Sequence, residues 1–308
     1  MPANLRYSLY GIVGLLIVAT LIIALKHLVK PNKEDHELGL RIRSWWVMAG
    51  IFILVIAISR ELTILFFVLI SALALKEYFN IIPKRDADRP VLILAYLAIP
   101  LQYLWVWLGW YGLFITFIPV YMFLLLQLGM ILKGETRGFL NAIGTLHWGL
   151  MITVFSLSHA AYLLALPDAG NPVANSAALL LFLVFLTEFN DVMQYVWGKL
   201  LGGVKIATKI SPNKTLSGLL GGVTTTTILA WLLAPYLTPF TTWQSVAIGA
   251  LIGIGGFIGD VTISALKRDI GIKDTGNLIP GHGGILDRVD SLTLTAPLFF
   301  HFVYYLYY

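Results

Sequence analysis

The sequence predicts an all-α, polytopic integral membrane protein. Of its 308 residues, 58% are apolar and only 12% are charged, and the mean hydropathy is +0.83. A soluble globular domain carries charge on about 25% of its residues, so this composition excludes a soluble domain and a disordered chain. The chain contains no cysteine, which excludes disulfide bridges and thiolate metal sites.

Apolar stretches separated by short charged or Gly/Pro-rich breaks predict ten spanning helices, since one crossing takes about 17 to 25 residues. We expect them near residues 8–25, 45–58, 62–75, 91–109, 112–132, 139–166, 176–198, 215–234, 244–264 and 291–308. The second and third stretches are short for full crossings and would also suit one re-entrant pair with Arg60 and Glu61 at its tip. The expected number of transmembrane helices is therefore eight to ten.

The positive charges lie on one side of the predicted topology. With ten spans, all 21 lysines and arginines except Arg6 and Arg60 fall on the same side. Because positively charged loops remain in the cytoplasm, we expect loops 199–214 and 265–290 to face the cytoplasm, with both termini outside, in the cytoplasmic (inner) membrane. The net charge of +5 then reflects loop placement, and we expect no nucleic-acid partner.

Intramembrane polarity divides the chain into N-terminal transmembrane helices, residues 1–175, and a catalytic half, residues 176–308, which carries nearly all of it. An ionisable group at bilayer depth costs at least about 2.5 kcal/mol and is rarely kept without a use. Glu188, Asp191 and Tyr195 are spaced i, i+3 and i+7, so they share one helical face. That face is predicted to line a polar cavity.

A second polar line begins at bilayer depth and ends at the cytoplasmic edge. Asp260, Ser264 and Lys267 recur at i, i+4 and i+7 of another predicted helix. In the loop that follows, up to residue 290, basic residues suit phosphate oxygens, paired carboxylates suit a hard cation such as Mg²⁺, and glycines let backbone amides approach a ligand. Asp287 and Asp290, at i and i+3, would present two carboxylates to one site if a helix begins there.

The loop at 199–214 is predicted to form a second wall of this site. Ser211-Pro212-Asn213 is a turn signal, and Lys214 adds a cation beside it. Thr215 is expected to cap the next helix, so that the helix N-terminus would point at an anion.

Together these features favour phosphoryl or nucleotidyl transfer involving a lipid phosphate, a water-soluble polyphosphate and Mg²⁺. The sequence contains no GxxxxGK[ST] motif, which argues against a P-loop enzyme. These residues do not select one base over another. A transporter or flippase is the alternative, because intramembrane acids suit it also, and a non-catalytic scaffold is a third.

Four short motifs within residues 264–290 select one family. Ser264-x-Leu-Lys-Arg268, Lys273-Asp274, Pro280-x-His-Gly-Gly284 and Asp287-Arg-x-Asp290 resemble the signature of the CDP-diacylglycerol synthase (phosphatidate cytidylyltransferase) family. Ser211-Pro-x-Lys-Thr215 and Asp191-x-x-x-Tyr195-x-x-Gly198 are similar to two further elements of that family. The resemblance covers residues 176–291, and the first half is matched only by its helical character.

The resemblance implies a commonly dimeric membrane enzyme that converts CTP and phosphatidate to CDP-diacylglycerol and pyrophosphate with Mg²⁺. By that likeness Asp260 and Asp287 would hold the metal ion, and a second ion is left open. The lipid phosphate oxygen would attack the α-phosphorus of CTP. The residues implied in catalysis are Asp260, Lys267, Arg268, Lys273, Asp274, His282, Asp287, Arg288 and Asp290. Those implied in substrate binding are Glu188, Asp191, Tyr195, Ser211, Pro212, Asn213, Lys214, Thr215, Ser264, Gly283 and Gly284.

The chain also departs from the family pattern near the expected substrate cavity. Leu216 and Ser217 stand where Trp and Glu usually follow the Ser-Pro-x-Lys-Thr element, and Gln194 replaces the small Ala before Tyr195. The metal loop keeps its pattern. The lipid acceptor is therefore left open between phosphatidate and another lipid phosphate, such as a polyprenyl phosphate.

Overall fold

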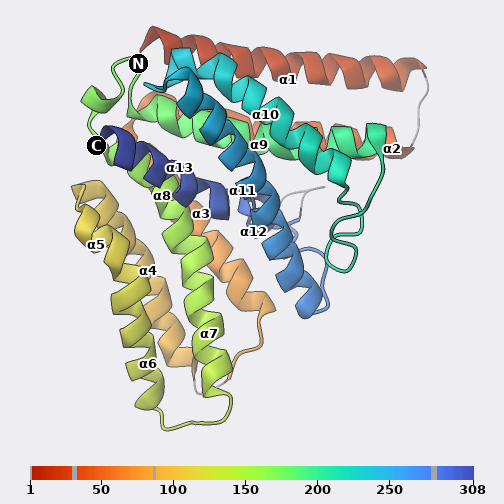
Figure 1. Cartoon of the computed structure of the whole chain (residues 1–308). Helices are drawn as coiled ribbons and strands as arrows, with labels where there is room; N and C mark the ends of the chain where they lie inside the picture. The colour runs from red at the N-terminus through yellow and green to blue at the C-terminus, as the bar shows by residue number, and fades with distance from the viewer. Residues whose placement is uncertain (1, 30–32, 86–87, 279–282) are drawn as a thin grey trace.

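The computed structural model describes residues 2–29, 33–85, 88–278 and 283–308, and among them no β-strand occurs (Figure 1). This confirms the all-α prediction. The helices are α1 (Ala3–Val29), α2 (Lys33–Ile58), α3 (Arg60–Ile81), α4 (Arg89–Leu108), α5 (Tyr111–Thr116), α6 (Phe123–Ile131), α7 (Phe139–Leu150), α8 (Ser156–Tyr162), α9 (Ser176–Leu201), α10 (Leu216–Leu237), α11 (Thr242–Asp269), α12 (Leu286–Val289) and α13 (Leu292–Tyr307). Single π-helical segments join α5 to α6 and α7 to α8, so each pair forms one continuous span.

Eight of the described spans are long and apolar enough to cross a membrane, and two shorter apolar helices, Ile42–Ile58 and Leu292–Tyr307, accompany them. This agrees with the predicted eight to ten. The predicted third stretch, 62–75, is too short, because α3 begins after its cap Ser59 and continues to Ile81. At about 1.5 Å per residue its 22 residues reach about 33 Å, enough for a full crossing.

The connections between helices gather at two ends of the molecule, as alternating crossings require. Both termini lie at one end (Figure 1). The hydrogen bonds that join segments there link Asn4 to Val173, Arg60 to Trp107 and Tyr307 to Pro239. At the other end, Arg85 binds the carbonyls of Glu135 and Arg137, and Arg268 binds that of Ile210. Loops 202–215 and 270–285 therefore meet at the end opposite the termini.

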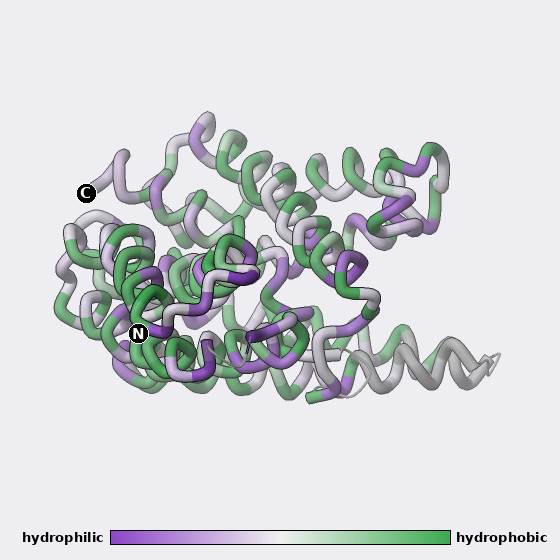
Figure 2. Tube along the Cα trace, turned by 90° about the horizontal axis from the view of Figure 1, so that it is seen from below, coloured by the Kyte–Doolittle hydropathy of each residue, from purple (hydrophilic) through white to green (hydrophobic). Residues whose placement is uncertain are grey.

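The helices are not parallel: α1, α2 and α10 run across the view of Figure 1, whereas α4, α6 and α7 run down it. Hydrophobic residues dominate the helices throughout (Figure 2). Small residues allow the closest approaches in the second half. A Cβ at Gly218 would lie 2.7 Å from the Gln194 carbonyl, and one at Gly253 would lie 2.9 Å from Val223 Cα. The backbones of α9, α10 and α11 thus come close enough to share one polar interior.

Candidate active site

The polar interior lies where α9, α11 and the loop before α10 meet. The Lys214 ammonium lies 2.5 Å from Asp260 Oδ2 and donates to Gln194 Oε1 over 3.1 Å. Ser264 donates to Asp260 Oδ1 at 3.2 Å, one turn along the same helix. On the neighbouring helix, Asp191 accepts a hydrogen bond of 3.0 Å from Ser291. The structure therefore brings together two carboxylates that the sequence predicted on separate helices, Asp191 and Asp260, and Lys214 from a loop.

Asp290 completes this group and shows how strongly the charges interact. Burial raises the pKa of Asp290 well above its ordinary value, and the nearby carboxylates of Asp260 and Asp191 raise it further. Lys214 is also buried, which lowers its pKa, but the attraction of Asp260 and Asp191 outweighs burial and the net pKa is raised. Like charges are thus forced together around one cation.

Glu188 and Arg288 lie at the edge of the same network. Glu188 is within electrostatic range of both Arg288 and Asp290. The Arg288 Nε atom is buried and has no hydrogen-bond partner in the described part of the chain. Four carboxylates, those of Glu188, Asp191, Asp260 and Asp290, therefore face two cations, Lys214 and Arg288, which leaves a formal excess of two negative charges.

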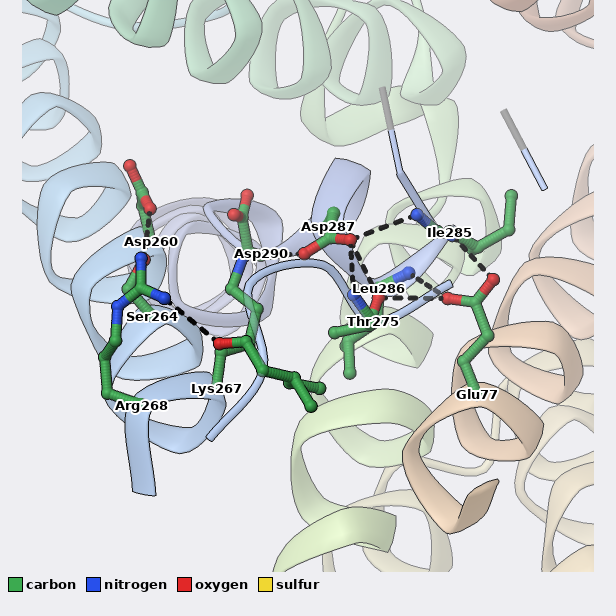
Figure 3. A network of polar contacts seen from close by, with 12 residues as sticks. Glu77, Asp260, Ser264, Lys267, Arg268, Thr275, Ile285, Leu286, Asp287 and Asp290 are labelled. Atoms are coloured by element: carbon green, nitrogen blue, oxygen red, sulfur yellow. Dashed lines mark hydrogen bonds and ion pairs between the residues drawn. The ribbon is translucent and has the colours of Figure 1, made fainter. Parts of the chain in front are cut away.

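Asp287 lies in a different environment, although it is only three residues from Asp290 (Figure 3). Its Oδ1 accepts from the Lys267 ammonium at 2.6 Å. Its Oδ2 accepts from the Thr275 amide at 2.8 Å, the Thr275 hydroxyl at 3.0 Å and the Gly284 amide at 3.0 Å. Burial raises the pKa of this carboxyl, but the bonds from Lys267, Gly284 and Thr275 together hold it below its usual range. The role of Asp287 as a metal ligand stays a prediction.

Glu77 is part of the site and was missed by the sequence analysis, which placed all chemistry after residue 175. It lies near the end of α3, and its two carboxylate oxygens accept from the Ile285 and Leu286 amides, each at 2.9 Å (Figure 3). The Thr275 hydroxyl also donates to it at 3.3 Å. Glu77 therefore ties the first half of the chain to the start of α12. An acid in the last turns of an apolar helix was the one available signal.

The glycines of this loop are needed for close approach. Gly283 has a φ of +81°, and a Cβ there would lie 2.6 Å from Asp287 Oδ2. A Cβ at Gly284 would lie 2.3 Å from Glu77 Oε2. These two glycines thus shape the cradle around two carboxylates, while their predicted contact with substrate stays untested.

The other predicted residues are distributed around this core. Thr215 caps α10 as expected, accepting from the Gly218 amide at 3.1 Å. Arg268 binds the carbonyls of Ile210 and Ile272 and so joins the two loops. Tyr195 is 55% exposed and contacts Lys199. The remaining loop residues that lie at the surface or its edge are Ser211, Pro212, Asn213, Lys273 and Asp274. His282 lies outside the described residues.

The fold and this interior define the class of protein: an all-helical integral membrane protein with a partly buried, charged site beside two basic loops. The chain belongs to the cytidylyltransferase family, whose model matches residues 39–306. The match extends well beyond the 176–291 segment that carries the motifs and includes most of α2 and all of α3 to α8, whereas α1 precedes it. Membership supports nucleotidyl transfer over the transporter and scaffold alternatives.

Individual relatives match over different lengths. An uncharacterized protein, YnbB, of Escherichia coli is 48% identical over 98% of this chain and 99% of its own length. A phosphatidate cytidylyltransferase of Synechocystis is 48% identical, over 37% of this chain and 39% of its own length. One from Rickettsia bellii is 36% identical over 49% of this chain and 66% of its own length. This chain thus spans less than two thirds of these two enzymes.

We expect Glu77→Gln to loosen the start of α12, because the neutral amide replaces a carboxylate that accepts two backbone amides. Hydrogen bonds to a charged group contribute about 1.5–3 kcal/mol, so amide exchange in peptides covering 283–290 should rise at least about tenfold. Hydrogen–deuterium exchange in detergent measures this. The exposed neighbour Lys76 provides the control variant Lys76→Gln, and equal exchange in both variants would remove Glu77 from this role.

We expect Asp287→Asn to destabilise the protein, because it leaves the largely buried Lys267 ammonium without its partner carboxylate. Loss of one member of a buried ion pair costs about 3–5 kcal/mol. Thermal unfolding in detergent should show a clearly lowered midpoint. Asp269→Asn, at the exposed last residue of α11, is the control; a matching midpoint for the two variants contradicts the assignment.

Proposed function

We propose that this protein transfers CMP from CTP to phosphatidate, giving CDP-diacylglycerol and pyrophosphate in phospholipid synthesis. The observation that carries the proposal is the partly buried Lys214–Asp260 pair, set among further carboxylates between two basic loops in a chain of the cytidylyltransferase family. Such a site adjoins both the bilayer, where a lipid phosphate resides, and the aqueous loops that a nucleotide can reach. In this reaction a phosphate oxygen of phosphatidate forms a bond to the α-phosphorus of CTP. The bond between the α-phosphorus and the oxygen that bridges it to the β-phosphorus breaks, and pyrophosphate leaves with that electron pair.

Mg²⁺ is proposed as the cofactor, and the donor set fits it. In the described residues no three His, Asp or Glu side chains are arranged as a ready-made metal site. The interior nevertheless carries a formal excess of two negative charges, which a divalent cation neutralises, and carboxylate oxygens are the ligands that Mg²⁺ prefers. When bound, the ion would neutralise charge on the transferring phosphates. A second ion stays a prediction.

The predicted pairing of Asp260 with Asp287 at the metal is one arrangement, and Asp260 with Asp290 is the better supported one. The reason is that Asp287 accepts from four protein donors, whereas Asp260 accepts from two and Asp290 from one, the Ser291 amide. Asp290 also lies within electrostatic range of Asp260 and Asp191. Asp287 then acts through Lys267, holding that ammonium at the edge of the site. Lys214, Lys267 and Arg288 would bind and orient phosphate oxygens.

The protein is an integral membrane protein, and we propose that the basic loops face the cytoplasm at the inner membrane. The structure groups loops 202–215 and 270–285 at one end, and these loops carry Lys214, Arg268 and Arg288 at or beside their ends. Positive loops favour the cytoplasmic side, which is also where CTP is available. A homodimer stays a proposal from the family resemblance.

A second candidate function is CTP-dependent transfer to another lipid phosphate. Gln194 is the observation that favours it, because this residue departs from the family pattern and its Oε1 accepts directly from Lys214. Its Nε2 atom is buried without a partner among the described residues. An unsatisfied amide donor beside the site cation could bind a phosphate oxygen of a different lipid acceptor.

We expect purified protein in mixed micelles to convert labelled CTP and phosphatidate to a labelled lipid and pyrophosphate, and EDTA to abolish both products. Asp260→Asn should lower turnover by at least about 100-fold, since it removes charge that positions the transferring group. Both products are measured together with CTP binding. CTP binding without turnover on phosphatidate would favour the second candidate, and no CTP binding would overturn both.

We expect Gln194→Ala to change the relative turnover of different lipid phosphates, because it removes the partner of Lys214 and restores the small residue usual in the family. The ratio of kcat/KM for phosphatidate and a polyprenyl phosphate should shift about tenfold, the value of roughly one hydrogen bond to a charged group. The KM for CTP should stay unchanged. A parallel loss with every acceptor and with CTP would assign Gln194 to general packing.

A further inference from the structure

Thr275 is a buried polar residue in an otherwise exposed loop. It lies between α11 and α12 and is 5% exposed, whereas its neighbours Lys273 and Asp274 are exposed. A hydroxyl removed from water costs free energy unless it makes hydrogen bonds. The Thr275 hydroxyl reaches two carboxylate oxygens, Asp287 Oδ2 at 3.0 Å and Glu77 Oε2 at 3.3 Å. No step of the proposed reaction has used this residue.

One hydroxyl proton serves both carboxylates. A threonine hydroxyl has a single hydrogen to donate, so Glu77 and Asp287 share it, and the Thr275 amide gives Asp287 a second donor at 2.8 Å. Without the hydroxyl, two like charges would face each other across this contact, and their repulsion is strongest where water is partly excluded. The hydroxyl therefore allows α3 and the loop to hold their carboxylates close together.

Asp287 passes this restraint on to Lys267. Its Oδ2 is held by Thr275 and by the Gly284 amide, and its Oδ1 accepts from the Lys267 ammonium at 2.6 Å. Figure 3 shows Thr275 and Asp287 between Lys267 and Glu77. A lysine ammonium is carried on a flexible four-carbon stem, so its position is set by its partner. The position of the Lys267 ammonium thus depends on the Thr275 hydroxyl.

Lys267 lies where it can contact a phosphate group that enters from the loops. It follows Asp260 by two turns of α11, on the same stripe as Ser264 and nearer the loop end. A leaving pyrophosphate gains negative charge as its bond to the α-phosphorus breaks. A cation held at that point therefore stabilises the transition state more than the bound substrate.

We propose that Thr275 is a positioning residue for the transfer reaction, because its hydroxyl holds the Lys267 ammonium where that ammonium binds an oxygen of the leaving pyrophosphate. This inference rests on the proposed function and adds to it a restraint that starts at Glu77 on α3. The first half of the chain thereby takes part in placing a cation of the site.

Thr275→Val tests the hydroxyl, since valine keeps the shape of the side chain and the backbone amide. We expect kcat to fall about 10- to 100-fold, as for a misplaced catalytic group, while the KM for CTP changes by less than about threefold. Thr275→Ser keeps the hydroxyl and should stay within about threefold of the wild-type kcat. Thr262→Val on α11 is the matched control, because the exposed Thr262 hydroxyl donates to the Ile258 carbonyl of its own helix. Equal losses in Thr275→Val and Thr275→Ser, or full activity of Thr275→Val, overturn the proposal.

The second measurement is the chemical reactivity of Lys267, which does not depend on turnover. Acetic anhydride acetylates lysine amines, and mass spectrometry of the peptides compares Lys267 with Lys273, an exposed lysine of the following loop. Acetylation of Lys267, normalised to Lys273, should rise about fivefold in Thr275→Val and stay at the wild-type level in Thr275→Ser and Thr262→Val. A lower kcat with unchanged acetylation of Lys267 overturns the proposal, because the hydroxyl would then act elsewhere.

Failure of the proposed function gives a different result. If the wild-type protein makes no CDP-lipid from CTP while acetylation of Lys267 still rises in Thr275→Val, the proposed function fails, and with it the role in transfer, but the attachment of Lys267 stands. Should Thr275→Val not fold, as judged by size-exclusion chromatography in detergent, Thr275→Ala removes the same hydroxyl and carries the same expectations. Unchanged kcat and unchanged acetylation of Lys267 in that variant overturn the proposal.

Discussion

The bridge that Thr275 makes between two carboxylates is the interaction on which the site depends. Its amide and hydroxyl donate to Asp287, and its hydroxyl also donates to Glu77. The described residues of this loop, 270–278 and 283–285, contain no helix, so their backbone amides need other acceptors. Glu77 and Asp287 supply them, and Asp287 in turn holds Lys267 on α11. One loop is thereby tied to α3, α11 and α12, and the position of Asp290 follows from that attachment.

The carboxylates of the charged interior outnumber the cations that face them. Placing several carboxylates together is costly in a low-dielectric interior, and Lys214 and Arg288 offset only part of that charge. A nucleotide triphosphate and a lipid phosphate bring still more negative charge. Under the proposed function, added positive charge would be needed for both substrates to bind, and the proposed divalent cation would supply it. The same excess of acid disfavours anion binding in the absence of metal.

Hydropathy predicted the helices well, because burial in a bilayer imposes a length that a single sequence reveals. Helical spacing likewise placed Asp191 and Asp260 on inward faces. The environments of Asp287 and Asp290 were not predictable from their i, i+3 spacing. The two acids stay one helical turn apart, yet Asp287 binds residues of the preceding loop while Asp290 joins the interior. Glu77 was missed because its partners are backbone amides 208 and 209 residues away, which carry no residue-type signal.

Gln194, one of the residues that depart from the family pattern, lies at the charged interior. Gln194 contacts Lys214, the cation at the centre of the acidic interior. Under the proposed function, a change of acceptor would need a new fit at this residue, because the basic side chains that would bind phosphate oxygens suit any lipid phosphate. At least half of this chain lies outside each of the matches to the Synechocystis and Rickettsia enzymes. Under the proposed function, acceptor choice would therefore change through Gln194 on α9, while Asp260 on α11 and Asp290 keep the acidic interior.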